Sequence, residues 1–293
     1  MKNEKQVYDL IKHKILVHTQ KNNIKPTDLW FRGESSLYDN MPSTLYRQIN
    51  FNDEEYKGKV TSLSDFHTIH QYEKWIYEKF KGELKEKDST LYDNITANGW
   101  DIVFYMQHYG IPTRFIDWTE SLNTALFFAT EKSHSNQDDA VLWLFDPKKM
   151  NEILRGEYQL QHPAPEHTYE HFVNAYQIGI NQALGAAISP HSDQGDFAST
   201  EVQRMYSQYG HFVFIPKEYI DMRLYISAIV NNEVTFEERL LKKLVIPNND
   251  ARLINNYLES IGCNRGKYKL SEQPLINAEQ YRFEEFLKNK QPL

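Results

Sequence analysis

The stretch QHYGIPTRFIDWTESLNTALFFAT, residues 107–130, decides the fold, because one helix ends in it and another begins. Helical spacing of apolar residues over 100–108 stops at Gly110, and a proline follows in the order that a helix end prefers. Ser121 is a suitable N-cap for the apolar helix that comes next. Between the two helices, Arg114 lies beside an expected central strand. The stretch therefore predicts helix, turn, strand and helix in close succession.

Working outward, helices and strands are expected on both sides of this stretch. Apolar residues recur at helical spacing in residues 3–19 and again after residue 247. They also do so in a helix that we expect to begin at Ser64 and Asp65, which are suitable N-terminal caps. EERLLKK at 237–243 is interpreted as a charged, amphipathic turn or helix. Three apolar runs of strand length stop at or near a proline: AVLWLF at 140–145, GHFVFIP at 210–216 and KLVIP at 243–247. This mixture predicts an α+β chain whose central, curved mixed sheet is flanked by helices.

The order of the elements predicts three segments along the chain. We expect an N-terminal helix at 1–24, a main domain at 25–262 and a C-terminal helical tail at 263–293. Residues 156–198 contain HPAPEH and SPHSDQGD and show little periodicity. We therefore expect an insertion near 156–198 within the main domain.

The composition narrows the class of protein. Of the 293 residues, 40% are apolar and 14% aromatic, which is enough for a sizeable core. No run approaches the roughly 18 consecutive apolar residues of a membrane span, and the charged N-terminus lacks the apolar region of a signal peptide. We therefore expect a cytoplasmic protein without membrane contact. A net charge of −7 argues against strong nonspecific binding to nucleic acid, which needs a basic face.

Two features of the sequence bear on disulfides and metals. Cys263 is the one cysteine, which excludes an intramolecular disulfide and a cysteine-based zinc site. HTYEH at 167–171 matches the pattern H-x-x-E-H, in which two histidines on one helix face ligate zinc. The motif lies in the weakly patterned region and has no identifiable third ligand, so we expect no metal.

WFRGES at 30–35 raises the question of what binds an arginine at the end of an aromatic pair. If the pair belongs to a core, Arg32 lies at its edge, and its planar fork needs a structural carboxylate or a ligand. A buried ion pair between Arg32 and Asp117 is the structural alternative. Arg114 would then join Asp117 or Glu34 in the same network, or line an anion site beside Arg32.

Three stretches together resemble the FRG domain, a family named after its aromatic-Arg-Gly motif. They are WFRGES at 30–35, QHYGIPTRFIDWTESLNTALFFAT at 107–130 with AVLWLFDP after it, and RMYSQYGHFVFIP at 204–216. Single positions that fit the same pattern are Pro42, Ser43, Arg47 and Glu73. The resemblance covers roughly residues 25–262, and the middle motif is long enough to be specific. The C-terminal GKYKLSEQPL departs from the family pattern.

The order of these motifs is similar to the three-motif layout of ADP-ribosyltransferases of the arginine-motif type, and this resemblance implies NAD as the substrate. In those enzymes the first arginine holds the dinucleotide, and a carboxylate stabilises the positive charge that develops on the ribose as the nicotinamide bond opens. Gln208 stands where the acid of the third motif is expected, and it supplies a hydrogen bond but no charge. Glu201 or Asp117 would have to supply the carboxylate, and the sequence leaves both open.

The predicted site is a cleft lined by two sets of residues, a catalytic group of residues and a group of residues that binds NAD. The catalytic group is Asp117, Glu201 and Gln208, and the NAD-binding group is Arg32, Gly33, Arg114, Thr119 and Ser121. Gly33 is included because a backbone without a side chain lets a ligand approach a strand closely.

We expect a NAD-dependent ADP-ribosyltransferase or NAD glycohydrolase with a macromolecular target, and the resemblance implies a bacterial toxin or phage-defence effector. A non-catalytic module that binds a nucleotide, a nucleic acid or a protein would use the same cleft without chemistry. An enzyme needs a carboxylate within hydrogen-bond reach of the ligand ribose, whereas a binding module does not. A pure scaffold would instead bury Asp117 against Arg32 and Arg114.

Overall fold

The structure is a computed structural model that describes residues 3–37, 40–49, 62–96, 101–160, 186–188, 210–216, 219–268 and 276–289. Its helices are α1 (Glu4–Asn22), η1 (Pro26–Asp28), α2 (Thr44–Gln48), α4 (Leu63–Lys87), α5 (Ser89–Thr96), α6 (Asp101–His108), α7 (Leu122–Thr130), α8 (Pro147–Arg155), α11 (Met222–Ile229), α12 (Val234–Leu240), α13 (Asn248–Ser260), η4 (Ala278–Tyr281) and α14 (Phe283–Asn289). Its strands are β1 (Trp30–Glu34), β2 (Phe115–Thr119), β3 (Ala140–Phe145), β4 (Ala186–Ile188), β5 (Gly210–Phe214) and β6 (Leu241–Ile246).

The strands form one sheet in the order β4-β5-β2-β1-β3-β6, so the α+β class is confirmed. Every described pair of neighbouring strands is antiparallel, where the sequence led us to expect a mixed sheet. The difference has a physical reason. Continuous apolar runs such as AVLWLF are typical of parallel strands because helices cover both of their faces. Here β3 is buried at all six positions although both of its neighbours are antiparallel.

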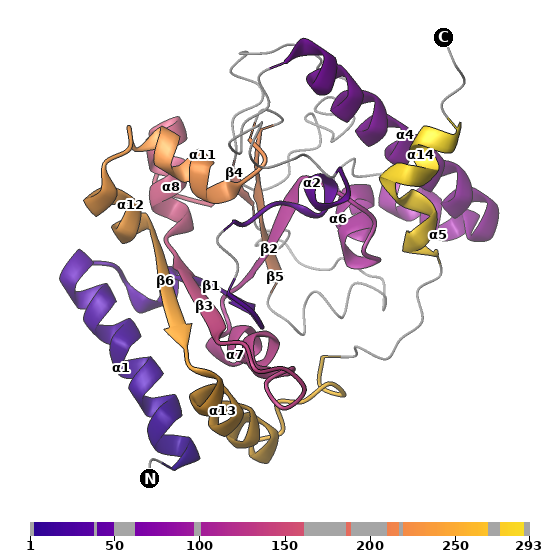
Figure 1. The fold of residues 1–293 in the computed structure, drawn as a ribbon. Coiled ribbons are helices and arrows are strands. Elements are labelled where there is room, and N and C mark those ends of the chain that lie inside the picture. Colours follow the sequence, from indigo (N-terminus) through magenta and orange to yellow (C-terminus); the bar gives the residue numbers. More distant parts are fainter. Residues whose placement is uncertain are drawn as a thin grey trace.

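The sheet has a weak junction between β1 and β2. Strand β1 pairs with β3 from Trp30 to Glu34, and β2 pairs with β5 along its whole length. In contrast, β1 and β2 share a single described pair, Phe31 opposite Thr119. Figure 1 shows β2 and β5 running at an angle to β1, β3 and β6. The sheet therefore consists of two well-paired halves that meet at this β1–β2 junction.

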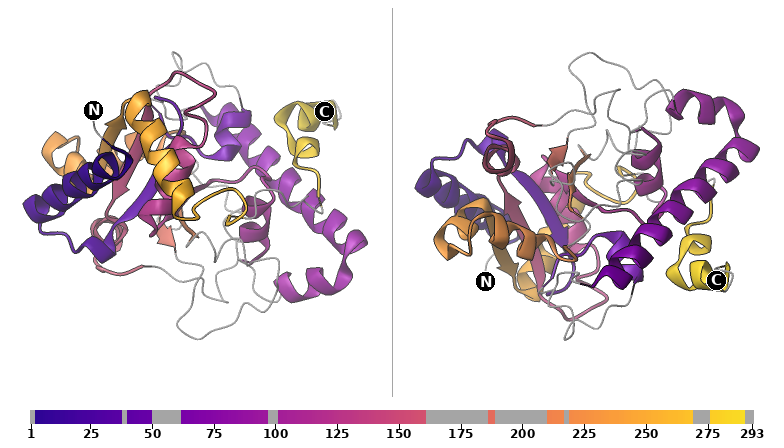
Figure 2. Two further views of the ribbon diagram at one scale, coloured as in Figure 1. Left: turned by 90° about the horizontal axis from the view of Figure 1, so that it is seen from below. Right: turned by 90° about the horizontal axis from the view of Figure 1, so that it is seen from above.

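Successive side chains of β1 and β3 enter two different hydrophobic cores, as the alternation of side chains along a strand requires, whereas β2 and β5 contribute to the larger core from both faces. Trp30 and Trp143 belong to the larger core, which also contains residues of α4, α6 and α11. Phe31 and Leu142 belong to the second core, which is closed by α1, α7 and α13. Figure 2 shows α4 and α14 on the other side of the molecule from α1 and α13.

The helix boundaries follow from local capping. Ser121 caps α7 as expected, because its Oγ accepts a hydrogen bond from the Thr124 amide at 3.2 Å. Helix α4 begins at Leu63, so its N-cap is Ser62 and not the predicted Ser64, since the Ser62 Oγ accepts from the Asp65 amide at 3.1 Å. Across the described ranges, we find no helix with both the length and the apolar character needed to cross a membrane.

Candidate functional site

Arg32 lies at the β1–β2 junction and is bound by protein groups on two sides. Its Nε donates to Oε1 of Glu34 at 3.1 Å, and its Nη1 donates to the main-chain carbonyl of Asp117 at 3.0 Å. The side chain is 15% exposed. The expected ion pair with the Asp117 carboxylate is not formed, and Glu34 supplies the carboxylate instead. Strand alternation explains this, because Asp117 is two residues from Thr119 and so shares the face of Phe31, not that of Arg32.

The guanidinium group of Arg32 takes the place of a backbone donor. The described ladder between β1 and β2 stops at Phe31 and Thr119, so the carbonyl of Asp117 has no ladder partner on β1. Arg32 satisfies this carbonyl, which a buried or half-buried main chain requires. Within the described ranges, Nη2 of Arg32 has no protein partner, so one edge of the planar fork is left for a ligand.

Asp117 is an exposed carboxylate in the middle of a central strand. The other four residues of β2 are buried, and the strand lies between β5 and β1. Oδ2 of Asp117 accepts a hydrogen bond from Nε2 of Gln107 at 2.8 Å. In the described part of the chain, Oδ1 has no protein partner. One oxygen is thus fixed by the protein and the other is available to solvent or to a ligand.

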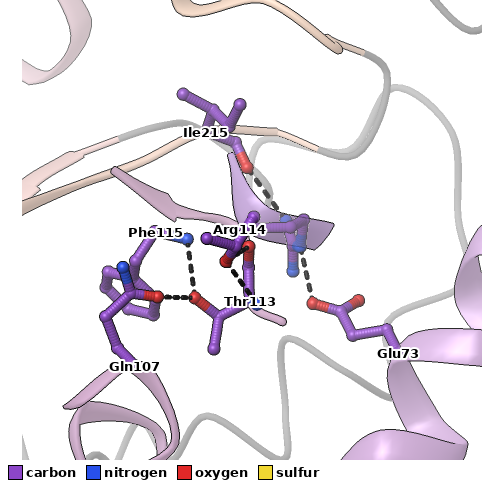
Figure 3. Close-up of polar contacts among 7 residues, drawn as sticks. Glu73, Gln107, Thr113, Arg114, Phe115 and Ile215 are labelled. Carbon is purple, nitrogen blue, oxygen red and sulfur yellow. Dashed lines mark hydrogen bonds and ion pairs between the residues drawn. The ribbon is translucent and has the colours of Figure 1, made fainter. Parts of the chain in front are cut away.

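Arg114 makes buried structural contacts, and its expected role in binding NAD stays a prediction. Its side chain is 2% exposed, and its Nε donates to Oε1 of Glu73 at 2.7 Å (Figure 3). Its Nη1 donates to the carbonyl of Ile215 at 3.1 Å, and the guanidinium group lies 4.2 Å from the ring centroid of Phe214. The pair ties α4 to β2 and to the end of β5. Since both charges are buried, removing either partner would cost about 3–5 kcal/mol of stability.

Three further residues of the predicted NAD-binding group build the corner between β1, β2 and α7. A Cβ at Gly33 would lie 1.8 Å from the carbonyl oxygen of Ala125, so α7 occupies the space that we expected a ligand to use. Thr119 accepts a hydrogen bond from the Ser121 amide at 3.0 Å, and Ser121 caps α7. This corner holds the β1–β2 junction in place, and the expected contacts of its residues with NAD stay predictions.

Two residues of the predicted catalytic group, Glu201 and Gln208, lie outside the described residues, as do Arg204 and the HTYEH motif. In the described ranges, we find no cluster of three histidine, cysteine, aspartate or glutamate side chains that would hold a metal ion. Of the predicted site residues, the structure therefore brings together Arg32 and Asp117 at the junction, and places Arg114 in the core.

Sequence reasoning missed the contacts that three polar residues make beside this pair. Glu34 follows Arg32 by two positions, so the period of a strand would have indicated that they share a face. Its Oε2 accepts from Nε1 of Trp143 at 2.9 Å. Gln107 belongs to the quoted 107–130 stretch, but only the structure shows its bond to the Asp117 carboxylate. His211 stacks on Trp30 with ring centroids 4.5 Å apart and lies 3.2 Å from Glu120, a contact between distant segments that no local pattern reveals.

The fold and the junction define an α+β protein with an arginine and an exposed carboxylate where two halves of an antiparallel sheet meet. Residues 27–138 match the family model described as the FRG domain. The chain therefore contains an FRG domain, and the match includes Arg32, Gln107 and Asp117. No curated protein and no solved structure matches the chain. The likeness to ADP-ribosyltransferases gains no support from these comparisons and stays a prediction.

Proposed function

We propose that the FRG domain uses NAD, either to transfer ADP-ribose to a macromolecular target or to hydrolyse NAD. The exposed Asp117 in the middle of β2 is the observation that carries this proposal. Exposure alone would be ordinary for an aspartate, but here one carboxylate oxygen is held by the buried Gln107 while the other stays open, in a strand whose other residues are buried. An acid kept at an uncovered point of a central sheet is typical of a functional group.

The proposed chemistry uses Asp117 and Arg32, whose side chains leave the sheet on opposite faces, so NAD would contact both by passing the unpaired part of the β1–β2 junction. The bond between the ribose and nicotinamide breaks, and its electron pair leaves with nicotinamide, so positive charge develops on the ribose. The free Oδ1 of Asp117 would stabilise this charge, as carboxylates do in glycosidases. The free Nη2 of Arg32 would bind a phosphate oxygen of the dinucleotide. Water or an acceptor side chain then forms the new bond to the ribose and loses its proton to solvent.

The proposal also includes the expected roles of Gln208 and Glu201 and the expected biological setting. Gln208 would orient the ribose, and Glu201 is the alternative source of the carboxylate. We propose a cytoplasmic bacterial toxin or phage-defence effector as the setting. The second candidate is a non-catalytic module that binds a nucleotide, a nucleic acid or a protein. It is favoured by one observation, namely that Glu34 already neutralises Arg32 and so reduces its pull on an anionic substrate.

The test is nicotinamide release from NAD by the purified protein, with and without cell lysate. Asp117→Asn keeps the size of the side chain and removes its charge, and we expect activity to fall by about 100-fold or more. Arg32→Lys keeps the charge and loses the fork, so we expect a higher KM. Asp93→Asn and Arg265→Lys alter an exposed aspartate and an exposed arginine elsewhere and serve as matched controls.

Melting temperatures accompany each assay, because Arg32 also supports the sheet. Full activity in a folded Asp117→Asn protein would remove Asp117 from the chemistry. No nicotinamide release by the wild type, with or without lysate, would remove NAD as the substrate and favour the binding module. Calorimetry with ADP-ribose would then test binding without chemistry.

A further inference from the structure

A chain of hydrogen bonds runs through the protein to the carboxylate of Asp117. The amide of Phe115 donates to Oγ1 of Thr113 at 3.1 Å, and the hydroxyl of Thr113 donates to Oε1 of Gln107 (Figure 3). Nε2 of Gln107 then donates to Oδ2 of Asp117 at 2.8 Å. All four residues belong to one short segment that turns back on itself.

The direction of this chain is fixed by its two ends. A backbone N–H can only donate, so Oγ1 of Thr113 accepts from Phe115 and its hydroxyl proton is left for Gln107. At the other end an ionised carboxylate can only accept, so the NH₂ group of Gln107 must face Asp117. The reverse orientation of the amide would set its oxygen against a carboxylate oxygen. The amide of Gln107 therefore has one favourable orientation.

The surrounding backbone keeps the chain of hydrogen bonds rigid. Helix α6 ends at His108, and Gly110, whose positive φ of 74° favours glycine, follows it in the turn that brings Thr113 beside Gln107. The start of α2 clasps the same turn, because Oγ1 of Thr44 accepts from the Thr113 amide at 3.0 Å and the Leu45 amide donates to the Thr113 carbonyl at 2.9 Å. Gln107 and Thr113 are both buried, so water does not compete for these bonds.

We infer that Gln107 is the positioning residue of Asp117, and that Thr113 sets its amide. Gln107 holds Oδ2 and so directs the free Oδ1 toward the substrate ribose. The inference rests on the proposed function, because it assigns Gln107 a part in the same reaction. Charged side chains on or next to the elements that carry this chain of hydrogen bonds are Arg32 and Glu34 of β1, Arg114 just before β2, Glu73 of α4 and Asp101 of α6.

Variants of Gln107 test the inference through activity. Gln107→Met keeps the length and removes the donor, and we expect kcat to fall by about 100-fold with little change in KM, because the reacting group is misplaced. Gln107→Glu sets two carboxylates against each other and should lose at least as much activity. Gln20→Glu makes the same change at an exposed position of α1 and should leave activity unchanged.

The double variant Gln107→Glu with Asp117→Asn separates position from stability. It restores one amide and one carboxylate in contact, so we expect the melting temperature to recover relative to Gln107→Glu. Activity should stay lost, since the carboxylate is then on α6 and not on β2. Wild-type kcat in Gln107→Met, or recovered activity in the double variant, would overturn the inference.

A second readout does not depend on activity. The side-chain amide of Gln107 gives its own pair of signals in ¹H–¹⁵N NMR spectra, and we expect them to move in Asp117→Asn and in Thr113→Val but to return toward the wild-type position in Thr113→Ser. Signals that stay in place in Asp117→Asn and Thr113→Val would overturn the inference even if NAD is the substrate. If the wild type is inactive but these signals move as expected, the proposed function is contradicted. The hydrogen-bond chain from Thr113 through Gln107 to Asp117 is then still supported.

Discussion

Gly33 shows at the residue scale how closely β1 and α7 approach. A Cβ at this position would lie 1.8 Å from the carbonyl oxygen of Ala125 and 2.6 Å from the amide nitrogen of Ala129, and both are main-chain atoms that cannot turn away. We expect Gly33→Ala to destabilise the protein by about 3 kcal/mol or more, because α7 must move off the sheet. Urea unfolding followed by circular dichroism measures this.

Gly82 supplies the matched control for Gly33. It is exposed on α4, and a Cβ there would meet no atom within 4 Å. Gly82→Ala should therefore stabilise the protein by about 0.5–1 kcal/mol, as alanine does in a helix interior. If both variants changed stability by the same amount, the close approach of α7 to β1 would be refuted.

Single residues also show the limit of what the sequence reveals. The aromatic-Arg-Gly motif correctly indicated that Arg32 needs a partner at the edge of a core, and the period of the strand points to Glu34. No comparable signal links Arg114 to Glu73, because they are 41 positions apart and lie on different elements. Gly33 shows a related limit, because α7 makes the close approach that the structure describes there. A glycine in a strand indicates a close approach, but the sequence does not say whether a ligand or a helix approaches.

At the scale of elements, α6 begins with Asp101, an acid whose carboxyl group is largely buried. Burial raises the pKa of Asp101 from 3.8 to about 7. The folded state therefore binds a proton at Asp101 more tightly than the unfolded state does. The stability that this bound proton contributes is lost as the pH rises from about 4 through 7. The positive end of the helix dipole offsets only about 0.3–1 kcal/mol of this loss.

Asp101→Asn tests this pH dependence. We expect the variant to exceed the wild type in free energy of unfolding by about 1–3 kcal/mol at pH 8 and to match it at about pH 3, where the carboxyl is protonated in the folded and the unfolded wild type. Urea unfolding at the two pH values measures the difference. Asp93→Asn, on the exposed side of α5, should show no such dependence. An advantage of equal size at both pH values would contradict the raised pKa.

The elements themselves were predictable to different degrees. AVLWLF gave the bounds of β3 without error, since a continuous apolar run has clear ends. β6 begins at Leu241, two residues before the predicted KLVIP, because EERLLKK is divided between the end of α12 and the start of the strand. β6 is an edge strand in the described sheet, where lysine side chains reach solvent, so its first residues look like a charged helix in the sequence.

At the scale of the whole molecule, the C-terminal segment is part of the main core. The hydroxyl of Tyr281 donates to Glu83 at 2.9 Å, and its carbonyl accepts from the hydroxyl of Tyr72 at 2.6 Å. The ring of Phe286 lies 5.7 Å from that of Trp75. η4 and α14 therefore cover the apolar side of α4, where the sequence predicts only a helical tail.

Two neighbouring residues of α14 test this packing against each other. Phe286 is buried and Leu287 is exposed. Phe286→Ala should cost about 3–5 kcal/mol and shift the fluorescence of Trp75 toward that of an exposed indole. Leu287→Ala should change stability by less than about 0.5 kcal/mol. Equal effects of the two substitutions would mean that α14 does not rest on α4.

The junction between β1 and β2 also sets an order of assembly for the site. Gln107 and Asp117 are 10 positions apart, whereas Arg32 and Asp117 are 85 apart. Closing the longer loop costs about 2 kcal/mol more in chain entropy, and it requires β1 and β2 to be brought together from distant parts of the chain. The carboxylate can therefore be oriented early by its own neighbours, while the cation arrives only when the two halves of the sheet join. A chain that has folded only in part would therefore have an oriented Asp117 carboxylate but would lack Arg32 beside it, and with it the phosphate contact that we propose.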